Sequence, residues 1–406
     1  MPQDTKPLRL SPAIQRAFRL AQARDLFLGV AVWAFAGCGP SIPARSSALP
    51  AHGPARSSVT SPPQAAPSIA ARMPRPGQAR GAAAVSANDA CEACHPEVAA
   101  QWRASLHRQS DVDPAYRMAF GIEPMPFCQT CHAPEADPAR KASAQESALG
   151  VGCVTCHLDG TSILAGPLAP DRPSLPAPHA VLRTSAFGGS GACAGCHEFD
   201  FPDAVLRGGH LRMQSTVSEH AGSPQASVSC AGCHMRRDAS GRRTHDVSVA
   251  GSPAMVRSAV TVKAQRVGDG RIRIELTPAT MGHAFPTGDL FRRVELTAEA
   301  LGEDQIVLAR DVRYLARHFR RTQRKSGLAM AVLVADDRVG PDSDPRVVEL
   351  DLGTVAKGRP IAWRVAYQRV EHPVTFDTDD AEVADEVSLG EGIMPVVELQ
   401  SRKESR

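Results

Sequence analysis

The sequence predicts a region of short helices and irregular coil, followed by an all-β domain of the sandwich type. Two observations predict this order. The pentapeptide C-x-x-C-H occurs five times between residues 91 and 234, and frequent Pro and Gly between the copies favour short helices joined by loops. From about residue 255, short runs alternate apolar and polar side chains around turns, as half-buried strands do.

The five pentapeptides carry the chemistry of the first region. C-x-x-C-H is the attachment site of c-type haem, because two thiols one helical turn apart each bond a haem vinyl group while the next imidazole binds the iron. We therefore expect five covalent haem c groups that template the fold, and the low aromatic content of 4% fits an interior filled by porphyrins. The expected thioether residues are Cys91, Cys94, Cys128, Cys131, Cys153, Cys156, Cys193, Cys196, Cys230 and Cys233. The expected proximal iron ligands are His95, His132, His157, His197 and His234.

Zinc is the competing interpretation of the cysteine pairs. Structural zinc sites usually close with two such pairs per ion, so five pairs leave a remainder, and zinc gives no reason for the histidine that follows every pair. Ten of the 11 cysteines lie in the pentapeptides, which excludes a disulfide framework if the haems are present.

The first residues predict export. Residues 1–25 are polar and cationic, and Leu26 to Ala36 is an apolar run too short to span a membrane but of the length of a signal-peptide core. The run ends in FAGCG, which resembles a bacterial lipobox, with Phe35 where Leu is usual. We expect residues 1–37 to be a lipoprotein signal and Cys38 to be lipidated, in a periplasmic or outer-membrane-associated protein. Ordinary cleavage that leaves Cys38 as a free thiol is the alternative.

Three further segments follow the signal. Residues 38–87 are rich in Ala, Pro, Ser, Gly and Arg and predict a disordered linker, residues 88–254 hold the haem motifs, and residues 255–406 form the β-domain. The net charge of +3 does not indicate nucleic-acid binding, because the cationic excess lies in the first 87 residues and the rest of the chain is acidic.

Seven runs predict the strands of an antiparallel sandwich. They are Ala259–Val267, Arg271–Pro278, Arg292–Leu301, Gln305–Val312, Arg346–Gly353, Ile361–Val370 and Met394–Gln400. A basic run at residues 316–325 and an acidic run at residues 377–386 are interpreted as solvated loops.

The sixth iron ligand decides the function, because a second protein ligand favours electron transfer and an open position permits catalysis. Five histidines outside the motifs are candidates for this distal position: His107, His179, His210, His245 and His283. His283 lies in GHAFPTG at the junction with the β-domain, where Gly and Pro allow close approach of the backbone. His220 is a reserve, and Met118 and Met213 are thioether alternatives.

Several short elements around the motifs carry a resemblance to a known family. They are a WxxSxH element (Trp102, Ser105, His107), GVGCVTCH in the third motif, CHEF followed by MQST, CHM followed by a histidine, and GHAFPTG. In these the chain resembles bacterial multihaem cytochromes c of the tetrahaem cytochrome and octahaem hydroxylamine oxidoreductase group, and in particular pentahaem members with a C-terminal β-domain. The resemblance implies that the five candidate histidines are distal ligands and that neighbouring haems pack as close pairs.

Two functions follow as hypotheses. The first is an electron carrier with mostly bis-histidine haems, which exchanges electrons with other cytochromes or a membrane quinol-oxidising module. The alternative is an enzyme that acts on a small nitrogen or sulfur oxyanion at one five-coordinate haem. The catalytic lysine of the family's nitrite reductases is absent, since all five motifs end in His, and neither Tyr116, Tyr314 nor Tyr367 lies in a recognisable haem-crosslinking context.

Overall fold

The computed structural model describes residues 73–122, 124–168, 176–202, 212–247, 252–323, 329–342, 344–372, 374 and 380–396. The residues from Ala65 onward form one compact unit. The signal segment, Cys38, most of the linker and His210 lie outside the described residues. Within the described residues, no helix has both the length and the apolar character needed to cross a membrane.

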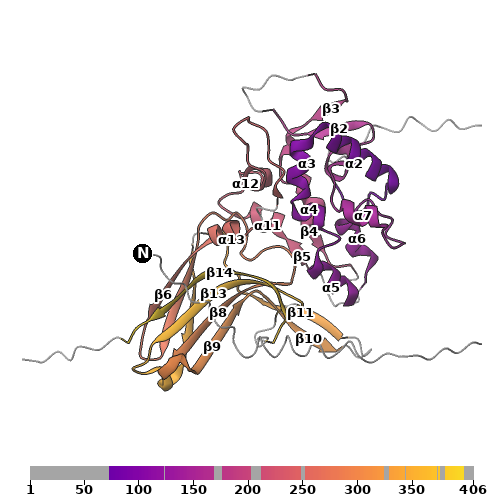
Figure 1. Ribbon diagram of the computed structural model, residues 1–406. Helices are drawn as coiled ribbons and strands as arrows, with labels where there is room; N and C mark the ends of the chain where they lie inside the picture. Colours follow the sequence, from indigo (N-terminus) through magenta and orange to yellow (C-terminus); the bar gives the residue numbers. More distant parts are fainter. Residues whose placement is uncertain are drawn as a thin grey trace, which may run out of the picture. The chain divides into compact units, whose positions relative to one another are not determined.

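Short helices dominate the region of the haem motifs, as predicted (Figure 1, indigo to magenta). Their starts follow from local sequence: Pro is the first residue of four of them, Ser105 caps another, and Ser143 forms a capping box with Glu146. The helices are α2 (Ala82–Cys94), α3 (Pro96–Arg103), α4 (Leu106–Gln109), α5 (Pro114–Ile122), α6 (Pro126–His132), α7 (Ala144–Leu149), α8 (Cys153–His157), α9 (Ser185–Gly188), α10 (Gly191–His197), α11 (Thr216–Ala221), α12 (Cys230–His234) and α13 (Pro253–Ala259).

The linker ends earlier than predicted. Helix α2 already begins at Ala82, and the backbone N–H groups of Gly77 and Gly81 donate to the carbonyls of Thr130 and Glu135, each at 2.7 Å. The prediction of disorder up to residue 87 was wrong because the alanines of this stretch favour a helix, and Ala84 packs in a small core with other apolar residues of the motif region. That core also contains Trp102, Leu149 and Val154.

Short strands interrupt the motif region, which the helix-and-coil prediction missed. Strands β1 (Leu158–Asp159), β2 (Ser162–Ala165) and β3 (Val181–Arg183) form one small sheet, and β4 (Glu198–Asp200) pairs antiparallel with β5 (Arg212–Ser215). Strands β1 and β4 each start directly after a motif histidine, so the strands fix the direction in which the chain leaves the third and fourth motifs.

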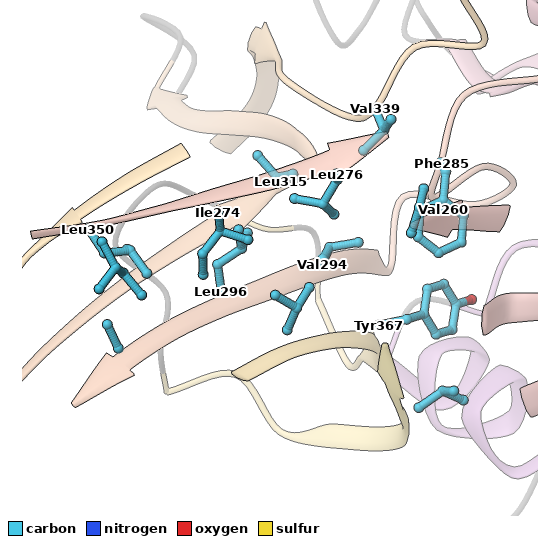
Figure 2. Close-up of a cluster of buried hydrophobic side chains, with 14 of the residues drawn as sticks. Val260, Ile274, Leu276, Phe285, Val294, Leu296, Leu315, Val339, Leu350 and Tyr367 are labelled. Carbon is cyan, nitrogen blue, oxygen red and sulfur yellow. The ribbon is translucent and has the colours of Figure 1, made fainter. Parts of the chain in front are cut away.

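Two antiparallel sheets enclose the main core of the C-terminal part. One has the order β12-β7-β6 and the other β14-β13-β8-β9. Alternate residues of facing strands, such as Ile274 of β7 and Leu296 of β8, are fully buried between them, as expected for a sandwich (Figure 2). The strands are β6 (Val260–Arg266), β7 (Arg271–Pro278), β8 (Arg292–Leu301), β9 (Val307–Leu315), β12 (Arg346–Asp351), β13 (Ile361–Val370) and β14 (Val383–Met394).

Six of the seven predicted strands are present, with small shifts at their ends. Of the seventh, Pro395 and Val396 are in no strand and residues 397–400 lie outside the described residues; the last described strand is β14, which begins inside the predicted acidic loop. The predicted basic loop contains β10 (Arg317–Gln323), which pairs with β11 (Ala329–Asp336) in a separate hairpin.

Candidate functional site

Each C-x-x-C-H motif lies in a short helix or at the end of one. The first motif ends α2, and the others occupy α6, α8, α10 and α12. Since an α-helix has 3.6 residues per turn, cysteines three positions apart lie on one face, so the two thiols of a motif are aligned for one porphyrin edge. The described cysteines form no disulfides.

Side chains from elsewhere hold these helices in place. The amide oxygen of buried Asn88, in the first motif's helix, accepts a hydrogen bond of 2.8 Å from the backbone N–H of Cys153 at the start of the third motif. This contact caps α8 and ties the first motif to the third. Asn88 was not identified from the sequence, and no local pattern marks a cap supplied from 65 residues away.

Four motif histidines each face one histidine from outside the motifs. The ring centroids are 6.5 Å apart for His95 and His179, 6.2 Å for His107 and His197, 6.0 Å for His157 and His245, and 6.1 Å for His234 and His283. Two imidazoles that share a metal, each with a metal–nitrogen bond of about 2 Å, have centroids roughly 6 Å apart. The described rings therefore fit an iron between them in all four pairs.

Hydrogen bonds at Nδ1 fix the tautomer of several of these rings. Nδ1 of His157 lies 2.8 Å from the carbonyl oxygen of Leu164, and Nδ1 of His245 lies 3.1 Å from that of Arg243. Because a carbonyl only accepts, the proton sits on Nδ1 and the lone pair of Nε2 is left for a metal. The same arrangement holds for His132 with Ser110 at 2.7 Å and for His283 with Ala284 at 3.1 Å.

Burial keeps these imidazoles neutral. Removal from water lowers the pKa of His107 to about 4, with a further contribution from the neighbouring His197. Burial likewise lowers the pKa of His234 and of His245 to about 4. Neutral imidazole is the form that binds a metal, so these side chains are ready for that role at neutral pH. His234 Nδ1 is buried without a hydrogen-bond partner among the described residues.

The second motif differs from the other four. The ring of Tyr116 stacks on His132 at a centroid distance of 3.7 Å, and no described histidine faces His132 as in the other pairs. The Tyr116 hydroxyl is buried and has no hydrogen-bond partner in the described part of the chain. The remaining candidate, His210, lies outside the described residues.

Contacts between cysteines connect different motifs. The thiols of Cys131 and Cys196 lie near each other, which joins the second motif to the fourth. Those of Cys193 and Cys230 likewise lie near each other, which joins the fourth motif to the fifth.

Weaker electrostatic contacts join the remaining motifs. Cys91 of the first motif is near Cys153 of the third, and Cys156 of the third is near Cys193 of the fourth. The fourth motif therefore adjoins three others.

The other sequence candidates have different surroundings. His220 is no reserve ligand, because both its ring nitrogens face carbonyl oxygens, of Gly282 at 2.9 Å and of Val228 at 2.8 Å. Met213 packs against an apolar cluster formed by Leu290 and Phe319. Within the described residues, no group of three or more His, Cys, Asp or Glu side chains is placed to hold a metal ion.

Comparisons with known proteins agree with these features. Residues 90–158 match the family model of cytochrome c554 and c-prime. The chain shares its fold with the crystal structure of a penta-heme cytochrome c552 from Thermochromatium tepidum, at a TM-score of 0.55 and 19% sequence identity, over 78% of this chain and 99% of that one. No curated protein matches the sequence. Together with the five motifs, the matches support a multihaem c-type cytochrome.

Proposed function

We propose that the chain is an exported pentahaem cytochrome c that carries electrons through haems with two histidine ligands. The observation that carries this proposal is the set of four imidazole pairs with centroids 6.0–6.5 Å apart. Two strong protein ligands leave an iron no open position for a substrate and suit it to one-electron transfer. The proximal ligands are His95, His132, His157, His197 and His234, and the distal ligands are His107, His179, His210, His245 and His283.

The contacts between motifs support a branched path for the electrons. When haem is bound, each cysteine sulfur is bonded to the edge of one porphyrin. Neighbouring sulfurs from two motifs therefore place the edges of two porphyrins close together. The first and third haems form one arm, the second and fifth haems are separate branches, and the fourth haem connects all three. The partners we propose are other cytochromes or a membrane quinol-oxidising module, reached from a lipid anchor at Cys38.

Two measurements on the purified native protein test this function. Mass spectrometry is expected to show a mass increment of five porphyrins, and low-temperature electron paramagnetic resonance is expected to show low-spin iron at all five. Addition of cyanide, nitrite or hydroxylamine is expected to leave the spectra unchanged. A missing porphyrin increment contradicts covalent haem, and ligand binding at several irons contradicts the carrier.

The surroundings of His132 favour a second candidate function. No described histidine faces this ring, and the buried Tyr116 hydroxyl next to it has no described partner. If the second iron keeps an open position, it can bind a small nitrogen or sulfur oxyanion, as in a redox enzyme. A single high-spin iron signal that shifts with nitrite or hydroxylamine would favour this enzyme, and five low-spin irons would exclude it.

A further inference from the structure

Two consecutive residues of α11 hold the backbone on both sides of His283. The Nδ1 atom of His220 lies 2.9 Å from the carbonyl oxygen of Gly282, directly before His283. The Glu219 carboxylate accepts a bond of 3.2 Å from the N–H of Ala284, directly after it, and one of 2.8 Å from the hydroxyl of Thr287. The loop at residues 282–288 is thus fixed at three points by one short helix.

His220 also contacts the backbone that leads to His234, the other histidine of the pair. Its Nε2 atom lies 2.8 Å from the carbonyl oxygen of Val228, just before the fifth motif. The buried ring therefore lies between the backbone that leads to His234 and the backbone that leads to His283, and the N–H of the neutral ring donates to one of the two carbonyls. Gly282 permits this approach, since a Cβ there would lie 3.1 Å from Nδ1 of His220.

The carboxylate of Glu219 is largely buried and forms an ion pair with Arg338. Its side chain is 12% exposed and pairs at 2.8 Å with Arg338, which is 7% exposed and also donates to the carbonyl of Pro286 in the same loop. Burial raises the pKa of Glu219, but the charge of Arg338 and bonds from Ser215 and Thr287 outweigh it, so the pKa is lowered. An ionised carboxylate makes shorter and stronger bonds to N–H and O–H donors than a neutral group does.

The far side of the loop is anchored in the sandwich. Phe285 exchanges two backbone hydrogen bonds of 2.9 Å with Val339, and its ring lies in the main core (Figure 2). With both sides held, the ring of His283 lies within 4° of parallel to that of His234, whereas the other three pairs are tilted by 38° to 58°.

We propose that Glu219 and His220 are positioning residues that hold His283 with its ring plane parallel to that of His234, and that they thereby set the spectrum and reduction potential of the fifth haem. This inference rests on the proposed ligation of that haem by His234 and His283. The angle between two axial imidazole planes sets the splitting of the iron d orbitals, so near-parallel rings give a rhombic low-spin signal distinct from that of strongly tilted rings.

The test compares variants of the full-length, haem-loaded protein by low-temperature electron paramagnetic resonance and by spectroelectrochemical titration. For Glu219→Ala and His220→Phe, we expect the loss of one rhombic signal and a shift of one of the five midpoint potentials. Glu219→Gln keeps one accepting oxygen and is expected to restore part of the signal. Thr287→Val removes the hydroxyl that donates to Glu219 and also contacts the Thr216 hydroxyl, and we expect it to shift the same signal even if the larger changes prevent folding.

The control is Glu146→Gln, which alters a buried carboxylate in the capping box of α7. It should leave every haem signal in place. Unchanged signals and potentials in folded Glu219→Ala, His220→Phe and Thr287→Val variants would overturn the inference. If His283 is not the distal ligand of the fifth haem, a different experiment shows it: the variant His283→Ala would leave all five irons low-spin.

Discussion

At the scale of single residues, hydrogen bonding and burial leave histidine rings in the neutral form that can bind a metal. A carbonyl oxygen holds the proton on Nδ1 of His157 and His245, and burial keeps the second of these rings uncharged. The motif histidines can be identified from the sequence because their spacing is local. It could not identify the carbonyls of Leu164 and Arg243, because these are set by the path of the chain.

Replacement of a distal histidine by methionine tests the ligation of the third haem. In His245→Met, a thioether replaces an imidazole, and we expect one midpoint potential to rise, because a thioether ligand favours the reduced iron. Spectroelectrochemical titration measures the change. His372→Met is the control, since His372 lies beside Glu371 and in none of the ring pairs, and it should leave all five potentials unaltered. Equal effects of the two variants would contradict the assignment.

Glu146 should make stability depend on acid pH. Its hydrogen bond with Arg140 is the main reason that its pKa falls from 4.5 to about 2. The ionised side chain therefore stabilises the folded state above the unfolded pKa, and this contribution is lost as the pH falls toward about 2. Because Arg140 is half exposed, we expect Glu146→Gln to lower the free energy of unfolding by only about 1 kcal/mol at neutral pH.

Urea unfolding at neutral pH and at about pH 2 measures this effect. The difference between Glu146→Gln and the parent protein should shrink in acid. Glu349→Gln, which breaks an exposed pair with Arg273, should have little effect at either pH. A difference that is constant with pH would show that the charge of Glu146 is not responsible.

At the scale of elements, the strands whose sequences alternate apolar and polar residues were predictable, whereas β10, β11 and β14 were not. Strand β7 alternates buried and exposed residues, which is the signal that its sequence carries. Strand β14 pairs only with β13, so its first residues face water and can be acidic, and the sequence suggested a loop there. Strand β11 is apolar on both faces in sequence and shows no alternation.

A core substitution tests the sandwich. Leu296 of β8 is fully buried between the two sheets, so Leu296→Ala should lower the free energy of unfolding by about 2–5 kcal/mol through lost contacts and a cavity. Leu308→Ala on the neighbouring strand β9 removes the same atoms at a side chain that is 43% exposed. It should cost less than about 0.5 kcal/mol. Denaturant unfolding followed by far-UV circular dichroism compares them, and similar losses would refute the two-sheet core.

At the scale of the whole molecule, the pairing of histidines follows tertiary structure and not sequence order. His107 lies one helix beyond the first motif, yet it faces His197 of the fourth. The sequence supplied the set of candidates, but only packing decides which ring meets which. The same holds for the contact of Cys131 with Cys196, which makes the fourth motif the meeting point of the others.

Removal of the fourth haem should divide the electron path. In the double variant Cys193→Ser and Cys196→Ser, electrons that enter the first haem should no longer equilibrate rapidly with the second and fifth. Flash-photolysis kinetics on the purified variant measures this. The matched control, Cys91→Ser with Cys94→Ser, removes a haem at the end of an arm and should leave exchange among the other four intact. Equal kinetics in both variants would contradict the branched arrangement.

Three of the four ring pairs reach across at least one other motif in the sequence. On the proposed ligation, cleavage between His179 and the fourth motif would keep His95 and His179 on one fragment. It would place His107 and His197 on different fragments, and likewise His157 and His245, so that release of one fragment would leave irons with a single histidine ligand. The irons left behind would lie open to carbon monoxide and oxygen. Gas binding by a stored preparation would therefore report cleavage of the backbone, before any loss of colour.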